Sequence, residues 1–195
     1  MATRVLHNFA FVLATASMMA VILLAPSNAR AGGYGGPFGF GTHASTADIA
    51  AVDISVMPDG RGLPPGSGTA EAGKQVYMGK CAACHGDKMQ GKKSAGAAAF
   101  IGGRGSLTGK KQKLTIESYW PYATTVFDYV RRAMPFNAPG SLSNDEVYAV
   151  TAYILSQAKI ITASDTLNAS VLANIKMPNR DGFIPDPRPD VRNYN

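Results

Sequence analysis

The sequence is poor in cysteine and histidine, with two and three residues respectively in a chain of 195. The cysteines are Cys81 and Cys84, while His7 and His43 lie far upstream of them. A structural zinc site needs about four Cys or His ligands, and this chain does not supply them near the cysteines. No β–α–β pattern surrounds the pair either, although a thioredoxin-type redox motif is found in that setting. The scarcity of ligands therefore disfavours a zinc site, and the missing β–α–β pattern disfavours a redox dithiol.

The excess of positive over negative charge is also modest. The formal net charge is +6. Residues 1–31 contain Arg4 and Arg30 and no acidic residue, so the rest of the chain carries 17 basic and 13 acidic residues, a net charge of +4. No nucleic-acid-binding motif accompanies this mild excess. We therefore expect no nucleic-acid partner.

The chemistry of the chain is concentrated in residues 81–85, which read Cys-Ala-Ala-Cys-His. Cys-x-x-Cys-His is the attachment signature of c-type haem. The two thiols form thioethers with the two porphyrin vinyl groups, and the adjacent imidazole binds the iron. We predict one covalent haem c attached to Cys81 and Cys84, with His85 as the proximal ligand. Both cysteines are then used, and no disulfide framework is left.

Residues 1–31 have the features of an export signal. Arg4 supplies the positive start, Phe9 to Ala25 is an uncharged apolar run, and residues 29–31 fit a small-x-small cleavage site. The alternative is an uncleaved membrane anchor, for which the apolar run is short. Either route delivers the chain outside the cytoplasm. We predict a periplasmic protein with no stable membrane span after cleavage.

The remaining chain divides by composition. Residues 32–68 are a Gly/Pro-rich extension, whose part from 48 begins with a short strand-like or extended segment. Residues 69–160 form the compact domain. Thr69 is a predicted helix N-cap, and residues 143–146 (Ser-Asn-Asp-Glu) form a capping box. Residues 161–195 are a Pro-containing tail that we expect to be extended but ordered; the alternative is a disordered terminus. Helices are predicted over 70–80, about 121–133, 143–157 and, in the tail, 170–175.

Three methionines compete as the second axial ligand, and each of them precedes a proline: Met57, Met134 and Met177. Met134 ends a predicted helix and lies 49 positions after His85. A methionine between two packed helices can be held rigidly, whereas the other two lie in Pro/Gly-rich extensions. We predict Met134 as the ligand, on the His/Met pattern of cytochromes c. The alternative for Met134 is a core methionine.

Arg104 and Trp120 are candidate partners of the haem propionates. A guanidinium suits a carboxylate because it can donate two parallel hydrogen bonds. The indole N–H of Trp120, the single tryptophan, needs a partner if it is buried. The alternatives are a surface arginine and a tryptophan that only packs in the core.

Basic residues dominate residues 74–113, with Asp87 as the one acid among them. They form either a solvated rim or a positive collar that steers an acidic redox partner. The nine basic residues are Lys74, Lys80, Lys88, Lys92, Lys93, Arg104, Lys110, Lys111 and Lys113.

A helix with Gly73 and Tyr77, then CAACH, then a Met-Pro loop, then a helix with Tyr153 resembles a class I cytochrome c. The resemblance implies that the first and last helices cross where Gly73 meets Tyr153. Longer stretches resemble the cytochrome subunit of the sulfur-oxidising (Sox) molybdenum dehydrogenases. They are DISVMPDGRGLPPGSG, GGRGSLT, SYWPYATTVFDYVRRAMPFNAPGSLSNDEVYAVTAYIL and KMPNRDGFIPDPRPD.

These resemblances imply an all-α, loop-rich class I cytochrome c fold with extensions at both ends. They imply an electron-transfer subunit that is not catalytic alone. Its partners would be a molybdenum-containing dehydrogenase subunit and a downstream cytochrome c acceptor. Some relatives carry two haems, whereas this chain has one Cys-x-x-Cys-His. Two other functions stay open, namely a free electron shuttle and a catalytic cytochrome such as a peroxidase or a thiosulfate-oxidising enzyme.

Overall fold

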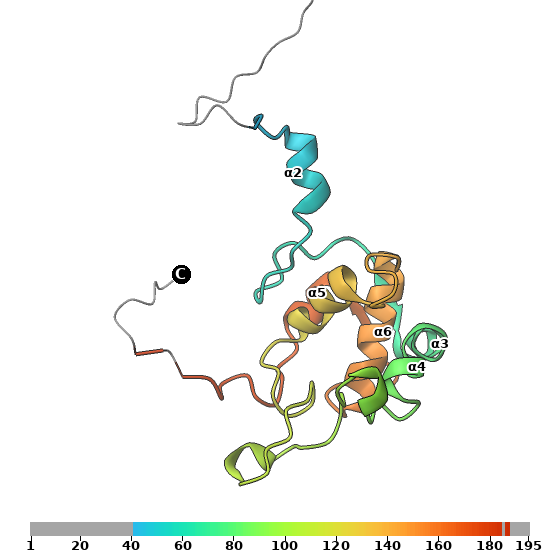
Figure 1. Ribbon diagram of the computed structural model, residues 1–195, viewed down its shortest axis with the longest axis vertical. Coiled ribbons are helices and arrows are strands. Elements are labelled where there is room, and N and C mark those ends of the chain that lie inside the picture. Colours follow the sequence, from blue (N-terminus) through green and yellow to red (C-terminus); the bar gives the residue numbers. More distant parts are fainter. Residues whose placement is uncertain (1–40, 185, 188–195) are drawn as a thin grey trace, which may run out of the picture. The chain divides into compact units, whose positions relative to one another are not determined.

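The computed structural model describes residues 41–184, 186 and 187 (Figure 1). The predicted export signal lies outside the described residues. The chain divides into two units after Ile49, and helix α2 (Thr46–Val52) spans that boundary without burying any residue. A strand-like or extended segment was expected from residue 48. This prediction was wrong for residues 48–52, which belong to α2. Ser45 and Asp48 cap the helix reciprocally, because the backbone N–H of each donates to the side chain of the other at 2.9 and 3.1 Å.

Two capped helices frame the body of the second unit. Helix α3 (Ala70–Lys80) begins after Thr69, whose hydroxyl accepts a hydrogen bond from the N–H of Ala72 at 3.3 Å. Helix α6 (Asn144–Gln157) begins with the predicted capping box, in which Ser143 and Glu146 each accept a bond from the other's N–H. Both predicted caps are confirmed. Local hydrogen bonds at the helix starts thus fix where these two helices begin.

Helices α3 and α6 pack against each other (Figure 1). A Cβ on Gly73 would lie 2.9 Å from the Cβ of Tyr153, which confirms the predicted contact between these two residues. The Tyr77 and Tyr153 rings meet next to it, with centroids 5.5 Å apart. Tyr77 is fully buried. The missing side chain at residue 73 therefore lets the first and last large helices approach closely.

Helix α5 (Ala123–Ala133) packs on α6 through Phe127. The centroids of the Phe127 and Tyr148 rings lie 4.5 Å apart. Val126 and Phe127 are buried, and Val130, one turn further along, is half-buried against the core. The helix begins two residues after the predicted start at Pro121. Tyr122 is extended and forms an antiparallel bridge with Lys176, so it is not available to the first turn.

A small sheet joins the segment before α3 to the segment after α6. Strand β1 (Ser67–Thr69) pairs antiparallel with β2 (Thr166–Asn168), and helix α7 (Ala169–Ala173) follows directly. The predicted short helix in the tail is confirmed, shifted by one residue at its start. Leu167, Leu172 and Met177 are buried in the main core. The tail up to this point is thus ordered and contributes to the core.

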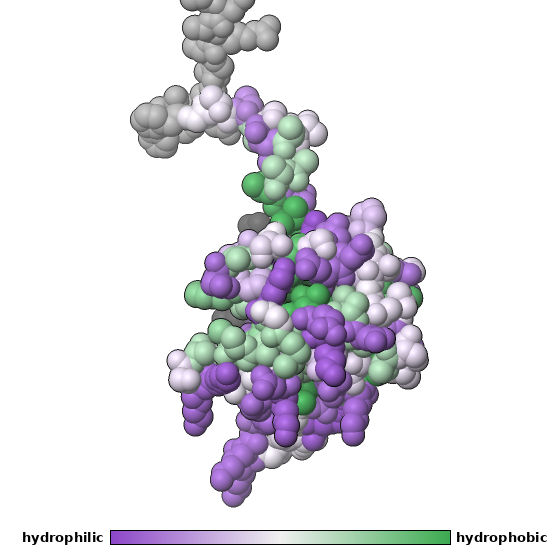
Figure 2. Space-filling view, turned by 90° about the vertical axis from the view of Figure 1, so that its right-hand side faces the viewer, coloured by the Kyte–Doolittle hydropathy of each residue, from purple (hydrophilic) through white to green (hydrophobic). Residues whose placement is uncertain are grey.

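The part between α3 and α5 is mostly loop, as expected. It contains α4 (Ala82–His85) and two short 3-10 helices, η1 (Lys93–Ala95) and η2 (Ser106–Thr108). Its lysines are exposed, and Figure 2 shows hydrophilic residues gathered at the lower end of the molecule, where Figure 1 places this segment. No helix in the described ranges is long and apolar enough to cross a bilayer.

Candidate haem-binding site

One turn of chain presents both thiols and the imidazole. Cys81 ends α3 and also precedes the first residue of α4. Its carbonyl oxygen accepts hydrogen bonds from the N–H groups of Cys84, at 3.1 Å, and His85, at 2.9 Å. These two bonds close the turn. They hold both cysteines and the His85 imidazole on one short segment. This is the arrangement that covalent attachment of a porphyrin followed by axial ligation requires.

No disulfide joins the two cysteines. Cys81 is half-buried and Cys84 is exposed. Burial raises the pKa of the Cys81 thiol to about 11, an effect that the neighbouring Lys80 only partly offsets. The attacking cysteine of a disulfide oxidoreductase has a lowered pKa, because its thiolate is the reactive form. The environment of Cys81 is therefore unlike that of a redox-active Cys-x-x-Cys pair.

The His85 ring is held from two sides. Its Nδ1 atom lies 3.5 Å from the carbonyl oxygen of Ala98, and the Phe100 ring packs on it with centroids 4.2 Å apart. Burial lowers the pKa of the imidazole, which favours the neutral form that binds metals. A carbonyl beside Nδ1 favours the proton on that nitrogen and leaves Nε2 as the metal-binding atom. His85 is thus prepared as an iron ligand.

Tyr77 anchors this turn to the core. Its hydroxyl donates a 2.8 Å hydrogen bond to the carbonyl oxygen of Gly86, the residue after His85. Gly86 has a positive φ of 81°, and a Cβ there would lie 2.4 Å from the side chain of Gln90. Glycine is favoured here because other residues rarely adopt this positive φ, whereas the exposed side chain of Gln90 could move aside. Neither this bond nor the Ala98 and Phe100 contacts were found from the sequence, because no local pattern marks them.

Burial separates the three candidate axial methionines. Met57 is 45% exposed, whereas Met177 is 1% exposed and packed in the main core. Met134 is half-buried at the end of α5, where its N–H donates to the carbonyl oxygen of Val130 at 3.1 Å. Its backbone is therefore fixed by the helix while its side chain is not enclosed in the core. Met134 fits the ligand role best of the three, and its ligation stays a prediction.

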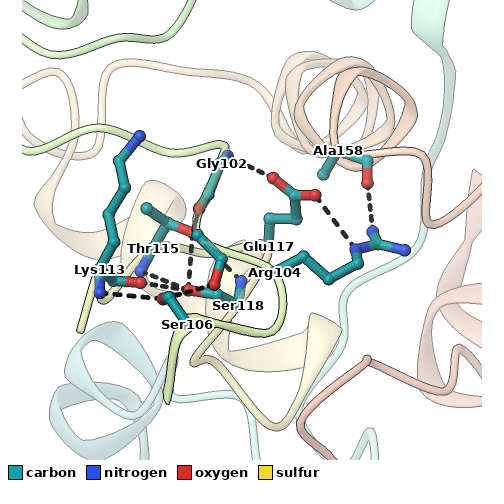
Figure 3. Close-up of polar contacts among 9 residues, drawn as sticks. Gly102, Arg104, Ser106, Lys113, Thr115, Glu117, Ser118 and Ala158 are labelled. Carbon is teal, nitrogen blue, oxygen red and sulfur yellow. Dashed lines mark hydrogen bonds and ion pairs between the residues drawn. The ribbon is translucent and has the colours of Figure 1, made fainter. Parts of the chain in front are cut away.

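Arg104 is held by the protein itself (Figure 3). Its Nε atom donates to the Glu117 carboxylate at 3.1 Å, and its Nη2 atom donates to the carbonyl oxygen of Ala158, at the end of α6, at 2.7 Å. A guanidinium has five N–H donors, so these contacts leave others for a further acceptor. The structure thus gives Arg104 a structural role that the sequence did not indicate. Its contact with a propionate stays a prediction.

Trp120 is half-buried and packs against the main core. Its ring meets the Tyr129 ring edge to face, with centroids 6.0 Å apart. This contact fits the core-packing alternative and leaves the propionate role of the indole N–H as a prediction.

The donor set fits a c-type haem. Two thiols share a turn with an imidazole whose pKa is lowered, and the thioether of Met134 follows at the end of α5. Within the described residues, no three or more His, Cys, Asp or Glu side chains gather where they could hold a metal ion. Cys81, Cys84 and His85 would hold the haem, and Met134 would complete the iron coordination.

Comparisons with known proteins agree with this donor set. A family model described as cytochrome c matches residues 70–158. A chain in the crystal structure of the sulfane dehydrogenase SoxCD from Paracoccus pantotrophus is similar, with 42% identity and a TM-score of 0.71. That match covers 77% of this chain and 73% of the other.

Two curated relatives match over shorter stretches. A thiosulfate dehydrogenase from Stutzerimonas stutzeri (strain A1501) is 33% identical over 95 residues, which are 48% of this chain. The cbb3-type cytochrome c oxidase subunit FixPc from Rhizobium leguminosarum bv. viciae is 59% identical over 34 residues, 17% of this chain. The matches span only 29% and 12% of the length of these relatives.

Proposed function

The chain belongs to the cytochrome c family, and we propose that it works in the periplasm as the haem subunit of a sulfur-oxidising molybdenum dehydrogenase. The expected helical class I cytochrome c fold is confirmed, with the small β1–β2 sheet as an addition. Electron transfer is the function of such a domain. The periplasmic location, the partner and the sulfur substrate are the proposal.

The similarity to the SoxCD chain carries this proposal. It extends over 77% of this chain at 42% identity, so it includes parts outside residues 70–158, where the family model matches. A general likeness among cytochromes would be expected to centre on the haem-binding core. Likeness in the flanking segments supports a shared subunit role.

The residues of the site suit one-electron transfer without bond chemistry. When bound, a haem supplies a reversible one-electron couple at its iron. His85 is held by the Ala98 carbonyl and the Phe100 ring, and the backbone of Met134 is held by the end of α5. Ligands that are held rigidly keep their positions in both oxidation states, which keeps the reorganisation on electron transfer small. A methionine ligand also raises the reduction potential.

We propose that electrons enter one at a time from a molybdenum centre that oxidises sulfite or protein-bound sulfane sulfur. They would leave to another cytochrome c. The exposed lysines of residues 88–113 support docking to an acidic partner, because complementary charges accelerate the encounter between proteins. The apolar run at residues 9–25 supports export, which haem attachment outside the cytoplasm would require.

Metal analysis of the protein from its native periplasm, purified gently at low salt, tests the proposal. We expect iron and molybdenum in a fixed ratio, with the molybdenum on a second polypeptide. Purification at high salt serves as the control, since screening weakens contacts between surface charges. Iron alone in a monomer at low salt would contradict the subunit role.

That second outcome would favour a free electron shuttle, one of the alternatives that the sequence left open. The match to a thiosulfate dehydrogenase instead favours catalysis at the iron. Catalysis needs an open or labile iron site, so rapid cyanide or carbon monoxide binding by the native protein would support it.

A further inference from the structure

The loop that contains the predicted ligand Met134 connects two helices. It leaves α5 at Ala133 and enters α6 at Asn144. The position of this loop therefore depends on what holds these two helix ends. One segment of the N-terminal extension, residues 54–67, is hydrogen-bonded to both helices. We refer to it as the strap.

The centre of the contact with α5 is Asp128, a residue that is 8% exposed. Its Oδ1 atom accepts a hydrogen bond from the N–H of Val56 in the strap at 2.8 Å. The same carboxylate accepts two bonds from the guanidinium of Arg132, one turn further along α5. Val56 itself is buried in the main core. Asp128 thus joins the strap to the last turns of the helix that ends at Met134.

Two further side chains of α5 hold the strap on either side of Asp128. Arg131 donates from Nη1 to the carbonyl oxygen of Ile54 at 2.8 Å. The hydroxyl of Thr124 donates to the carbonyl oxygen of Pro58 at 3.1 Å. Both bond to the backbone of a distant segment, which fixes its path along the helix.

The strap then reaches the first turns of α6, where three side chains bond to its backbone. The three bonds run from Ser67 N–H to Asp145 Oδ1 at 2.7 Å, from Asn144 Nδ2 to Pro65 O at 3.3 Å, and from the Tyr148 hydroxyl to Pro64 O at 2.9 Å.

Glycines in the strap allow this close fit. A Cβ on Gly66 would lie 2.8 Å from Asp145 Oδ1 and 3.2 Å from the Tyr148 ring. A Cβ on Gly62 would lie 2.1 Å from the carbonyl oxygen of Ser55 within the strap itself. Both glycines have positive φ angles, 147° and 85°, which other residues rarely adopt. The strap is therefore an ordered, closely packed part of the fold and not a flexible linker.

We propose that the strap positions the second axial ligand of the iron, with Asp128 as its main positioning residue and Asp145 as a secondary one. The inference rests on the proposed role of Met134 as that ligand. Thr124, Asp128 and Arg131 hold the strap to α5, and Asn144, Asp145 and Tyr148 hold it to α6. Both ends of the ligand loop are thereby tied to one segment. Without this tie, the last turn of α5 could shift, and Met134 would no longer be held in the position from which it would bind the iron.

The experiment uses the full-length, haem-loaded protein and imidazole as an external ligand for the ferric iron. In Asp128→Asn, the amide can still accept a bond but loses the charge that holds Arg132. We expect its affinity for imidazole to rise about 10-fold to 100-fold, the range seen when a residue supporting a metal ligand is lost. The long-wavelength charge-transfer band of a methionine-bound ferric haem should weaken in parallel. We expect Asp145→Asn to show a smaller change in the same direction.

Asp59→Asn is the matched control. Asp59 lies in the strap but pairs with Arg61 of the same segment and is exposed, so imidazole affinity should stay at the native value. If Asp128→Asn does not fold, Thr124→Val removes one strap bond while keeping the size of a buried side chain, and it should raise imidazole affinity more than Asp59→Asn does. Native imidazole affinity in a folded Asp128→Asn protein, even one with lower stability to urea, would overturn the inference.

Met134→Ala separates the two claims. If this variant keeps the methionine band, Met134 is not the ligand, and both the assignment and the role of the strap fail. If the band disappears in Met134→Ala while Asp128→Asn behaves like the native protein, the ligand assignment holds and only the strap inference fails.

Discussion

Gly73 in α3 lies directly against the backbone of Ala149 in α6. A Cβ placed on Gly73 would be 1.8 Å from the Ala149 carbonyl oxygen and 2.4 Å from its carbonyl carbon. Backbone atoms inside a packed helix cannot move aside as a flexible side chain can. The crossing of the first and last large helices, which frames the site, therefore depends on the absence of a side chain at this position.

We predict that Gly73→Ala lowers the free energy of unfolding by about 1–3 kcal/mol, the usual cost of overpacking a core. Urea unfolding of the haem-loaded protein measures this change. Gly79→Ala is the control, because Gly79 lies in the same helix with nothing within 4 Å of its Cβ position. Alanine there should raise stability by about 0.5–1 kcal/mol. Equal effects at the two positions would contradict the close helix contact.

The capping box of α6 gives a second prediction. Ser143→Ala removes the hydroxyl that accepts the N–H of Glu146, and such a loss costs about 1 kcal/mol. Urea unfolding of the variant checks the value. Ser141→Ala, at an exposed position two residues earlier, should leave stability almost unchanged. If both serines behave alike, the box contributes no more than an ordinary surface hydroxyl.

Asp128 should make stability depend on acidic pH. Burial raises the pKa of its carboxyl, but the hydrogen bonds from Arg132 and Val56 and the charges of Arg132 and Arg131 outweigh burial, so the pKa lies below its ordinary value. A lowered pKa in the folded state stabilises the protein above the unfolded pKa of about 3.9. This stabilisation is lost as the pH falls through the folded pKa.

The stability difference between native protein and Asp128→Asn should therefore be largest near neutral pH and shrink below about pH 4. Urea unfolding of both proteins at a series of pH values measures this difference. A difference that grows as the pH falls would show that the carboxyl is not stabilised in its charged form.

The attachment residues give a prediction that does not depend on folding energies. Cys81→Ser and Cys84→Ser should each keep one thioether, so haem should stay on the chain in a denaturing gel. The double variant should lose it. Haem staining and the mass of the intact protein check both results. A haem that remains covalently bound in the double variant would exclude these cysteines as the attachment points.

Sequence patterns predicted the local features of the fold well. The caps at Thr69 and Ser143 follow from hydrogen bonds between near neighbours, which sequence spacing records. The contact between Gly73 and Tyr153 came from the resemblance to cytochromes c. The helix at Thr46–Val52 was missed although Ser45 and Asp48 have the spacing of a capping box, because no apolar periodicity supports that helix.

Long-range features could not be predicted from the sequence. Strands β1 and β2 have three residues each and lie almost a hundred positions apart, too short for a pattern of alternation. The bond from Val56 to Asp128 spans 72 positions. The ion pair between Arg104 and Glu117 was not predicted, because no local pattern marks it. In each case the determining contact joins residues whose proximity exists only in the folded chain.

The reduction potential of Met134→His tests the central claim most directly, that this chain transfers electrons through a haem held by His85 and Met134. Axial ligands set haem potentials over a range of about 0.8 V, and a harder imidazole ligand favours the ferric state. The account predicts that Met134→His keeps its haem and has a markedly lower potential, while Met177→Leu, at a core position, keeps the native value. An unchanged potential in Met134→His, or a large shift in Met177→Leu, would contradict it.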